Sequence, residues 1–236
     1  MATIRVLRSN RVGGGDDRGS DMLNRWLVPM VCALLAAAPA AAAGLVVRVV
    51  DGKGHPVPDA VVTLVSGGTS APVQRRAPVT RVIDQKNLMF VPYIEVFRPG
   101  DTVVFRNSDR TRHHVYSFSR AKAFEFVLAP GQSSPPLVLD KAGVVAVGCN
   151  IHDQMAAYLV VTDASSVARS RSDGNATFAE LAPGAYDVRV WHPRQRPGRA
   201  TSTTVDVSAS TRAPVAITLS LLPDPRQQMD REHMQY

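Results

Sequence analysis

Short segments rich in valine and threonine recur along this chain, and paired glycine and proline residues separate them. Such segments favour β-strands, because branched side chains pack well on a pleated surface and Gly/Pro pairs mark turns. No amphipathic helical period is sustained in any part of the sequence. Many short strands at this spacing predict an all-β fold of sandwiches or Greek-key barrels.

The chain is long enough for one large or two small domains, at 236 residues. Charged residues make up 20% and hydrophobic residues 45% of it, a balance typical of a globular protein. The predicted strands cover residues 45–50, 60–65, 81–83, 88–90, 94–97, 102–106, 114–118, 124–128, 144–147, 157–162, 176–178, 186–191, 202–207 and 214–221.

The N-terminal part predicts export. An apolar, alanine-rich run from Trp26 to Ala43 follows Arg25, and small residues that suit a signal-peptide cleavage site end it. We expect residues 1–43 to be a signal peptide, with Met22 as an alternative start, and the mature protein to be periplasmic without a stable membrane span. The alternative is an uncleaved membrane anchor.

Charge and cysteine content narrow the class of protein. The formal net charge is +7, which suits an acidic protein partner or plain solubility. The sequence has no nucleic-acid-binding motif and no interleaving of aromatic with basic residues, so we expect no nucleic-acid partner. Of the two cysteines, Cys32 lies in the leader, which leaves Cys149 alone in the mature chain. Exported proteins usually pair their thiols, so Cys149 needs another role.

Metal-ligating residue types gather in two stretches. Cys149, His152 and Met155 recur at every third position after an apolar strand, and His113 and His114 lie upstream. One cysteine and two histidines with a weak axial methionine form the ligand set of blue-copper sites, and thioether is a poor ligand for zinc. The alternatives are a buried structural thiol at Cys149 and simple core packing of Met155.

These residues resemble the cupredoxin family, with the short ligand-loop spacing of amicyanin. Small cupredoxins place their first histidine ligand six residues after an asparagine, which matches His113 and Asn107. The resemblance implies a Greek-key sandwich that holds one type 1 copper ion through His113, Cys149, His152 and Met155. His114 stands where asparagine is common, so His114 stays open as an alternative ligand. The resemblance also places His114 beside the thiolate and its side chain near Asn150.

Among cupredoxins, the motifs look closest to the bacterial group labelled methylamine-utilisation-like proteins. A second resemblance covers the flanks of the chain: the segment around Pro56-Val57 and the Leu181-Ala182-Pro183-Gly184 run are similar to carboxypeptidase-regulatory or transthyretin-like sandwiches. We therefore expect one small sandwich at 45–66 and 164–222, interrupted by a copper domain at 80–163. Residues 223–236 are expected to form a polar tail.

These features predict a one-electron carrier, not an enzyme, that exchanges electrons with an acidic redox protein. Two other functions stay open: a periplasmic copper carrier without redox shuttling, and a structural sandwich for protein interaction. Arg106, Arg110, Arg112 and Arg120 form either an ordinary charged face or the docking surface for the partner. The sequence makes no prediction of the oligomeric state.

Overall fold

The computed structural model describes residues 43–67, 76–152, 154–198, 201–208, 211, 213–224 and 226. The sixteen elements placed within these ranges are all β-strands, so the predicted all-β fold is confirmed. The predicted leader lies outside the described residues except for Ala43, its last residue. No helix among the described residues is long and apolar enough to cross a membrane.

The strands have the following bounds in chain order: β1 (Ala43–Asp51), β2 (Val61–Ser66), β3 (Thr80–Lys86), β4 (Met89–Val91), β5 (Ile94–Phe97), β6 (Asp101–Asn107), β7 (His113–Ser119), β8 (Lys122–Leu128), β9 (Leu137–Leu139), β10 (Gly143–Cys149), β11 (Ala156–Val161), β12 (Ser166–Arg169), β13 (Asn175–Leu181), β14 (Gly184–Trp191), β15 (Thr201–Val207) and β16 (Val215–Leu219).

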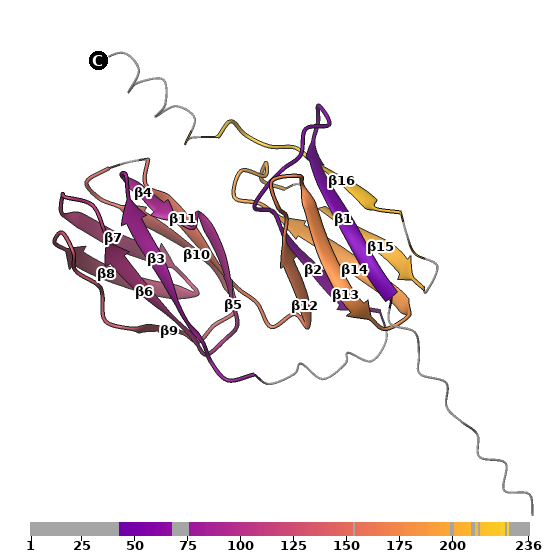
Figure 1. The fold of residues 1–236 in the computed structure, drawn as a ribbon, viewed down its shortest axis with the longest axis horizontal. Helices are drawn as coiled ribbons and strands as arrows, with labels where there is room; N and C mark the ends of the chain where they lie inside the picture. The colour runs from indigo at the N-terminus through magenta and orange to yellow at the C-terminus, as the bar shows by residue number, and fades with distance from the viewer. Residues whose placement is uncertain are drawn as a thin grey trace, which may run out of the picture. The chain divides into compact units, whose positions relative to one another are not determined.

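The first two and the last five strands build one sandwich, here called the flanking sandwich (β1, β2 and β12–β16). Its sheets have the strand orders β13-β1-β16 and β12-β2-β14-β15, and one buried apolar cluster lies between them. β1 pairs antiparallel with β13 and parallel with β16. In Figure 1 the indigo ribbons of β1 and β2 therefore lie among orange and yellow strands, so segments far apart in the chain are neighbours.

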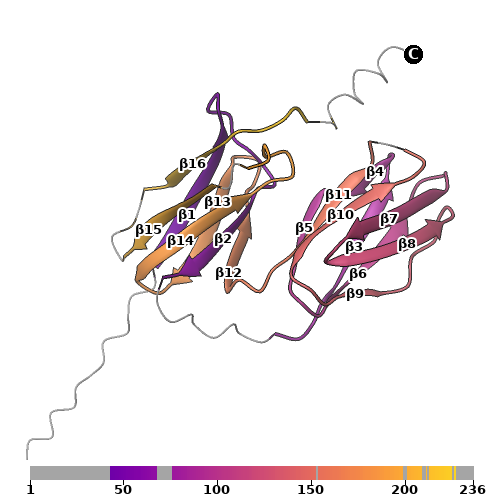
Figure 2. The same cartoon turned by 180° about the vertical axis from the view of Figure 1, so that it is seen from behind.

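The strands between them build the central sandwich (β3–β11). Its sheets have the orders β5-β11-β10-β7-β8 and β4-β3-β6-β9. The pairs β3–β6 and β5–β11 are parallel, and the other pairs are antiparallel. Its strands alternate buried and exposed side chains, as expected when one face of each sheet covers a core. Figure 2 shows both sets of strands from behind.

A smaller apolar cluster contains side chains of both sandwiches. Val61 of β2 belongs to it together with Ile94 and Val160 of the central sandwich, and the rings of Tyr158 and Trp191 lie 5.8 Å apart. The guanidinium of Arg169 donates a hydrogen bond to the carbonyl oxygen of Ile94. The outer face of β5 and β11 is therefore covered, not open to solvent.

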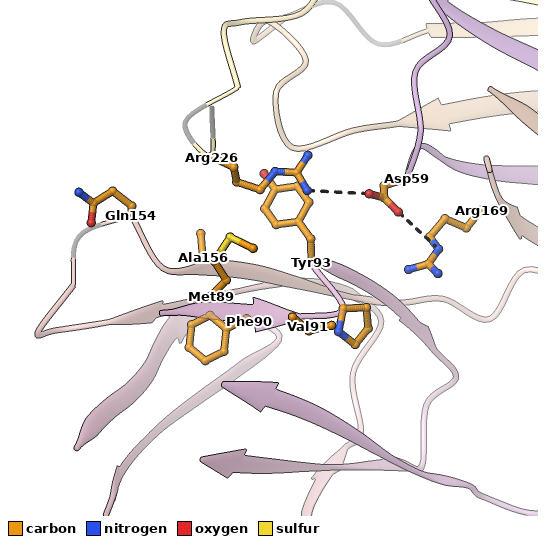
Figure 3. Close-up of a pocket in the computed structure, with 10 residues that line it drawn as sticks. Asp59, Met89, Phe90, Val91, Tyr93, Gln154, Ala156, Arg169 and Arg226 are labelled. Carbon is orange, nitrogen blue, oxygen red and sulfur yellow. Dashed lines mark ion pairs between the residues drawn. The ribbon is translucent and has the colours of Figure 1, made fainter. Parts of the chain in front are cut away.

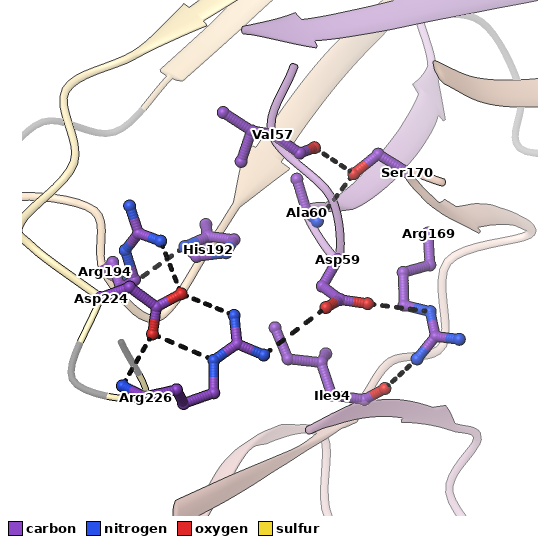
Figure 4. A network of polar contacts seen from close by, with 10 residues as sticks. All are labelled: Val57, Asp59, Ala60, Ile94, Arg169, Ser170, His192, Arg194, Asp224 and Arg226. Carbon is purple, nitrogen blue, oxygen red and sulfur yellow. Dashed lines mark hydrogen bonds and ion pairs between the residues drawn. The ribbon is translucent and has the colours of Figure 1, made fainter. Parts of the chain in front are cut away.

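The start of the predicted polar tail carries a charged network (Figure 4). The carboxylate of buried Asp224 accepts hydrogen bonds of 2.9 Å from Arg194 and 2.7 Å from Arg226. Burial alone raises the pKa of Asp224, but the hydrogen bonds and charge of Arg226 outweigh burial and lower it to about 2. The guanidinium of Arg226 also lies 3.9 Å from the ring centre of Tyr93, which is a cation–π distance.

Candidate metal centre

The donor residues at 113, 149 and 152 lie at the ends of paired strands. His113 opens β7 and Cys149 closes β10, where Cys149 lies opposite Val115 in the antiparallel ladder. His152 follows in the connection to β11, and its carbonyl oxygen accepts a hydrogen bond of 3.0 Å from the backbone N–H of Met155. Strand pairing and this turn bring two separate stretches of chain to one place.

The three side chains converge on a small space. The Nδ1 atom of His113 lies 3.7 Å from the Sγ atom of Cys149, and the Nδ1 atom of His152 lies 3.9 Å from the same sulfur. One donor atom of each residue lies within 4.8 Å of the others. His113 and Cys149 are buried, and His152 is half-buried. Cys149 is a free thiol.

Met155, the fourth predicted ligand, is buried and packs in the apolar core of the central sandwich, in the same cluster as Cys149. It directly precedes β11, and Gly148 lies opposite Ala156 in the β10–β11 ladder. The β-hairpin formed by β10 and β11 therefore holds the thioether and the thiol in one apolar environment.

His114 does not belong to this group of side chains. It follows His113 in β7, and consecutive residues of a strand point to opposite faces. Its Nε2 atom lies 2.6 Å from the carboxylate of Glu125 on β8. The backbone N–H of Asn150 donates to the carbonyl oxygen of His114 at 3.0 Å, and the expected contact between their side chains stays a prediction.

Asp109 is also part of the site, and it was not among the predicted site residues. Its Oδ2 atom lies 2.9 Å from the Nε2 atom of His113, so the ring of His113 is held from the side opposite the sulfur. The backbone N–H of Asp109 in turn donates to the side-chain oxygen of Asn107 at 2.9 Å. The Asn107-x-Asp109 spacing is a signal that could have pointed to this residue, and it is a weak one.

The turn between β3 and β4 holds the carboxylate of Asp109. The backbone N–H groups of Asn87 and Leu88 donate to its two oxygens at 2.6 and 3.1 Å. Both turn residues have positive φ angles, 56° and 57°, a conformation that suits tight hairpin turns. The β3–β4 hairpin thus holds the carboxylate of Asp109, which in turn holds the ring of His113.

The donor set fits a metal ion. Metal–nitrogen and metal–sulfur bonds of about 2.0 and 2.3 Å allow the two atoms to lie up to about 4.3 Å apart on one ion. The observed separations of 3.7 and 3.9 Å fall within that limit. One thiolate and two imidazoles form the equatorial set of blue-copper sites, and the buried thioether beside the thiol favours copper over zinc.

A cavity of about 290 Å³ lies beside the ligand loop (Figure 3). Met89, Phe90 and Tyr93 form much of its apolar wall, and Gln154 of the ligand loop lies at its edge. The charged side chains in it are already paired, because Asp59 contacts both Arg169 and Arg226. None of the three clustered donor residues lines this cavity.

Four arginines of the central sandwich differ from its other arginines. Arg76, Arg81 and Arg98 contact carboxylate or carbonyl oxygens. Within the part of the chain that the structure describes, no ion pair is found for the exposed residues Arg106, Arg110, Arg112 and Arg120.

No family model matches the sequence, and no curated protein matches it either. Solved structures that share features with it include a copper(I) amicyanin variant, which is 20% identical, covers 43% of this chain and 98% of its own, and has a TM-score of 0.33. Amicyanin from Paracoccus versutus is 17% identical over 42% of this chain and 98% of its own, also with a TM-score of 0.33. A copper-containing nitrite reductase from Thermus scotoductus is 21% identical over 42% of this chain and 25% of its own, at the same TM-score.

Proposed function

We propose that this protein is an exported type 1 copper protein that carries single electrons. The principal support is the group of His113, Cys149 and His152, whose donor atoms lie within 4.8 Å of one another. A buried thiol between two imidazole nitrogens has few uses other than metal binding, and Met155 belongs to the same buried cluster as the thiol. His113 rather than His114 is the proposed upstream ligand.

Neighbouring groups of the chain orient these donors. Asp109 accepts the Nε2–H of His113, which leaves Nδ1 unprotonated and turned toward Cys149. Cys149 must lose its proton to bind, so binding releases a proton. His113, Cys149, His152 and Met155 would hold the copper ion, which would supply a one-electron couple when bound, without transfer of any atom.

The proposed role is electron transfer between proteins, not catalysis. The proposed partner is an acidic redox protein, because the four unpaired arginines of the central sandwich would attract a negative surface. Such attraction weakens as salt screens the charges.

We further propose that the flanking sandwich is a carboxypeptidase-regulatory or transthyretin-like domain that is split by insertion of the copper domain. The whole protein is proposed to be periplasmic and to belong to the methylamine-utilisation-like group. The pairing of β1 with β13 and β16 supports the split, because these partners follow the central sandwich in the chain. Insertion is physically easy where the ends of the inserted part lie close together.

The test is visible and EPR spectroscopy of the mature chain with copper(II). We expect intense blue absorption and reversible one-electron reduction, both lost in Cys149→Ser and His113→Ala. His114→Ala is the matched control, because it removes a neighbouring imidazole whose side chain contacts Glu125 instead. Copper transfer to an acceptor without redox cycling would assign the protein to copper carriage. A stable protein that binds no copper would refute the metal site.

A further inference from the structure

An aromatic row runs along the outer face of β7. His114, Tyr116 and Phe118 alternate with the buried residues of that strand and point away from the core. The ring centres of His114 and Tyr116 lie 6.4 Å apart, and those of Tyr116 and Phe118 lie 5.2 Å apart. Phe118, at one end of the row, is 82% exposed. Exposed apolar side chains that gather on one face mark an interaction site more often than single ones do, so this row is a candidate interaction surface.

The middle of this aromatic row touches the backbone beside the metal centre. Tyr116 lies opposite Gly148 in the β7–β10 ladder, and Gly148 directly precedes Cys149. A methyl group placed on Gly148 would lie 3.0 Å from the Cζ atom of Tyr116. The tyrosine ring therefore packs directly on the glycine, and the surface contacts the chain one residue from the thiol.

The aromatic row belongs to a sheet face that is only partly covered. At the β5–β11 edge of the same sheet, Ile94 and Val160 pack in the cluster that includes Val61 of the flanking sandwich. At the β7–β8 edge, Val127 lies opposite His114 and is 56% exposed. The open apolar surface is thus continuous with an established interface.

Unpaired positive charges lie at both ends of the aromatic row. Arg110 and Arg112 directly precede β7, and Arg120 lies in the turn between β7 and β8; all three are exposed and lack an ion pair within the described ranges. Among the described residues, two acidic side chains on or near this face have partners: Glu125 contacts His114, and Asp140 contacts Lys122. This charge pattern is complementary to an apolar patch with an acidic rim.

We propose that the aromatic row is the docking face for an acidic one-electron partner protein, with Phe118 as its principal apolar contact. This inference rests on the proposed electron-carrier function and adds the place of docking. It assigns docking to the β7–β8 face instead of the exposed tip of the ligand loop at Ile151.

The test uses a plant-type [2Fe–2S] ferredoxin as a small acidic probe. Binding to the ¹⁵N-labelled, copper-free mature chain is followed by NMR, and reduction of the copper(II) form by stopped flow. For the wild-type chain we expect signal broadening at β7 and β8 and binding that weakens with salt. Phe118→Ser should bind about tenfold more weakly and be reduced about tenfold more slowly, which is the usual effect of losing a principal interface contact. Arg120→Glu should weaken both in the same direction.

Two control variants carry the same chemical changes away from this face. Val138→Ser removes an exposed apolar side chain from β9, and Arg48→Glu reverses an exposed charge on β1 of the flanking sandwich. Both controls should bind the probe and be reduced as the wild-type chain is. Absorption and reduction potential should be unchanged in all variants.

Three results would overturn the docking proposal. The first is an equal effect of Phe118→Ser and Val138→Ser on binding, and the second is signal broadening around Ile151 together with loss of binding in Ile151→Ser. The third is a wild-type dimer that dissociates in Phe118→Ser. Binding without salt dependence would also overturn it. Because NMR binding needs no copper, a chain that binds the probe at β7 but lacks a copper redox couple would refute the carrier function and not the docking face.

Discussion

The buried ring of His113 has a polar neighbour at each of its nitrogens. Nδ1 faces the sulfur of Cys149 at 3.7 Å, and Nε2 contacts Asp109 at 2.9 Å. A metal-binding nitrogen must be unprotonated, so the proton belongs on Nε2 and Asp109 accepts it. The turn residues Asn87 and Leu88 keep the carboxylate in place through their backbone N–H groups. Asp109 is thus a positioning residue for the proposed ligand.

Replacing Asp109 by asparagine should weaken copper(II) binding by about 10–100-fold, the usual cost of losing such a partner. The reduction potential should rise, because a negative charge that stabilises copper(II) is lost. Affinity is measured by competition with a chelator, and potential by redox titration. Asp84→Asn is the control, because Asp84 lies on β3 but contacts Ser108. Equal affinity of Asp109→Asn and wild type would refute the positioning role.

His192 gives the flanking sandwich a pH-dependent stability. It is buried, and its Nδ1 atom accepts a hydrogen bond of 3.2 Å from the backbone N–H of Arg194. Burial lowers the pKa of His192 most, and the charges of Arg194 and Arg226 lower it further. Although the charge of Asp224 opposes this, the pKa falls from 6.5 to about 4. Between these values the unfolded chain binds a proton that the folded chain does not. Stability is therefore full above pH 6.5 and falls as the pH drops to 4, by about 3 kcal/mol.

Urea unfolding of the copper-free chain at pH 7 and at pH 4.5 measures this effect. His192→Gln should remove most of the pH dependence in that window, whereas His55→Gln should not, because His55 lies exposed in a turn. A His192→Gln variant with the wild-type pH dependence would show that other groups cause it.

The residues of the site differ in how far the sequence predicts them. Cys149, His152 and Met155 share one short loop, so their spacing already indicates convergence, and the spacing from Asn107 favours His113. Asp109 escaped prediction because its role depends on a hairpin distant in sequence that presents two backbone N–H groups. The contact of His114 with Glu125 was not predicted, since Glu125 becomes its neighbour only through the pairing of β7 with β8.

At the level of elements, the pairing of β7 with β10 depends on a glycine. The ring of Tyr116 occupies the space where a side chain at Gly148 would lie. Gly148→Ala should destabilise the copper-free chain by about 1–3 kcal/mol, the usual cost of overpacking. Shortening the tyrosine in the double variant Gly148→Ala, Tyr116→Ser should recover part of that loss.

Chemical unfolding measures the effect of Gly148→Ala, with Gly52→Ala as control. Gly52 has no atom within 4 Å of an added methyl group, so its substitution should be nearly neutral. Similar losses for both glycines would show that backbone flexibility, not the tyrosine ring, explains the cost.

Strand positions were easier to predict than strand partners. Valine-rich alternation located most strands within a few residues of their observed bounds. It did not specify the parallel pairs β3–β6 and β5–β11, because a strand reads the same whichever neighbour it pairs with. Turn chemistry fixes only local hairpins, and parallel pairs join segments that are distant in the chain.

For the whole molecule, two separate apolar cores and one smaller shared cluster determine how metal binding affects stability. The donor residues belong to the central sandwich alone, so copper should stabilise that sandwich directly. The shared cluster around Ile94 and Val61 is small, so it should pass little of this stabilisation to the flanking sandwich.

Removal of copper by a chelator should therefore act mainly on the central sandwich. With free copper at a hundred times its dissociation constant, the linked stabilisation is about 2.7 kcal/mol. Hydrogen exchange followed by mass spectrometry should show faster exchange in peptides from β10 and β11 after chelation, and little change in peptides from β13 and β14. Cys149→Ser, with and without copper, provides the control. Equal loss of protection in both sandwiches would show that the shared cluster makes them one cooperative unit, because the flanking sandwich could then respond only through it.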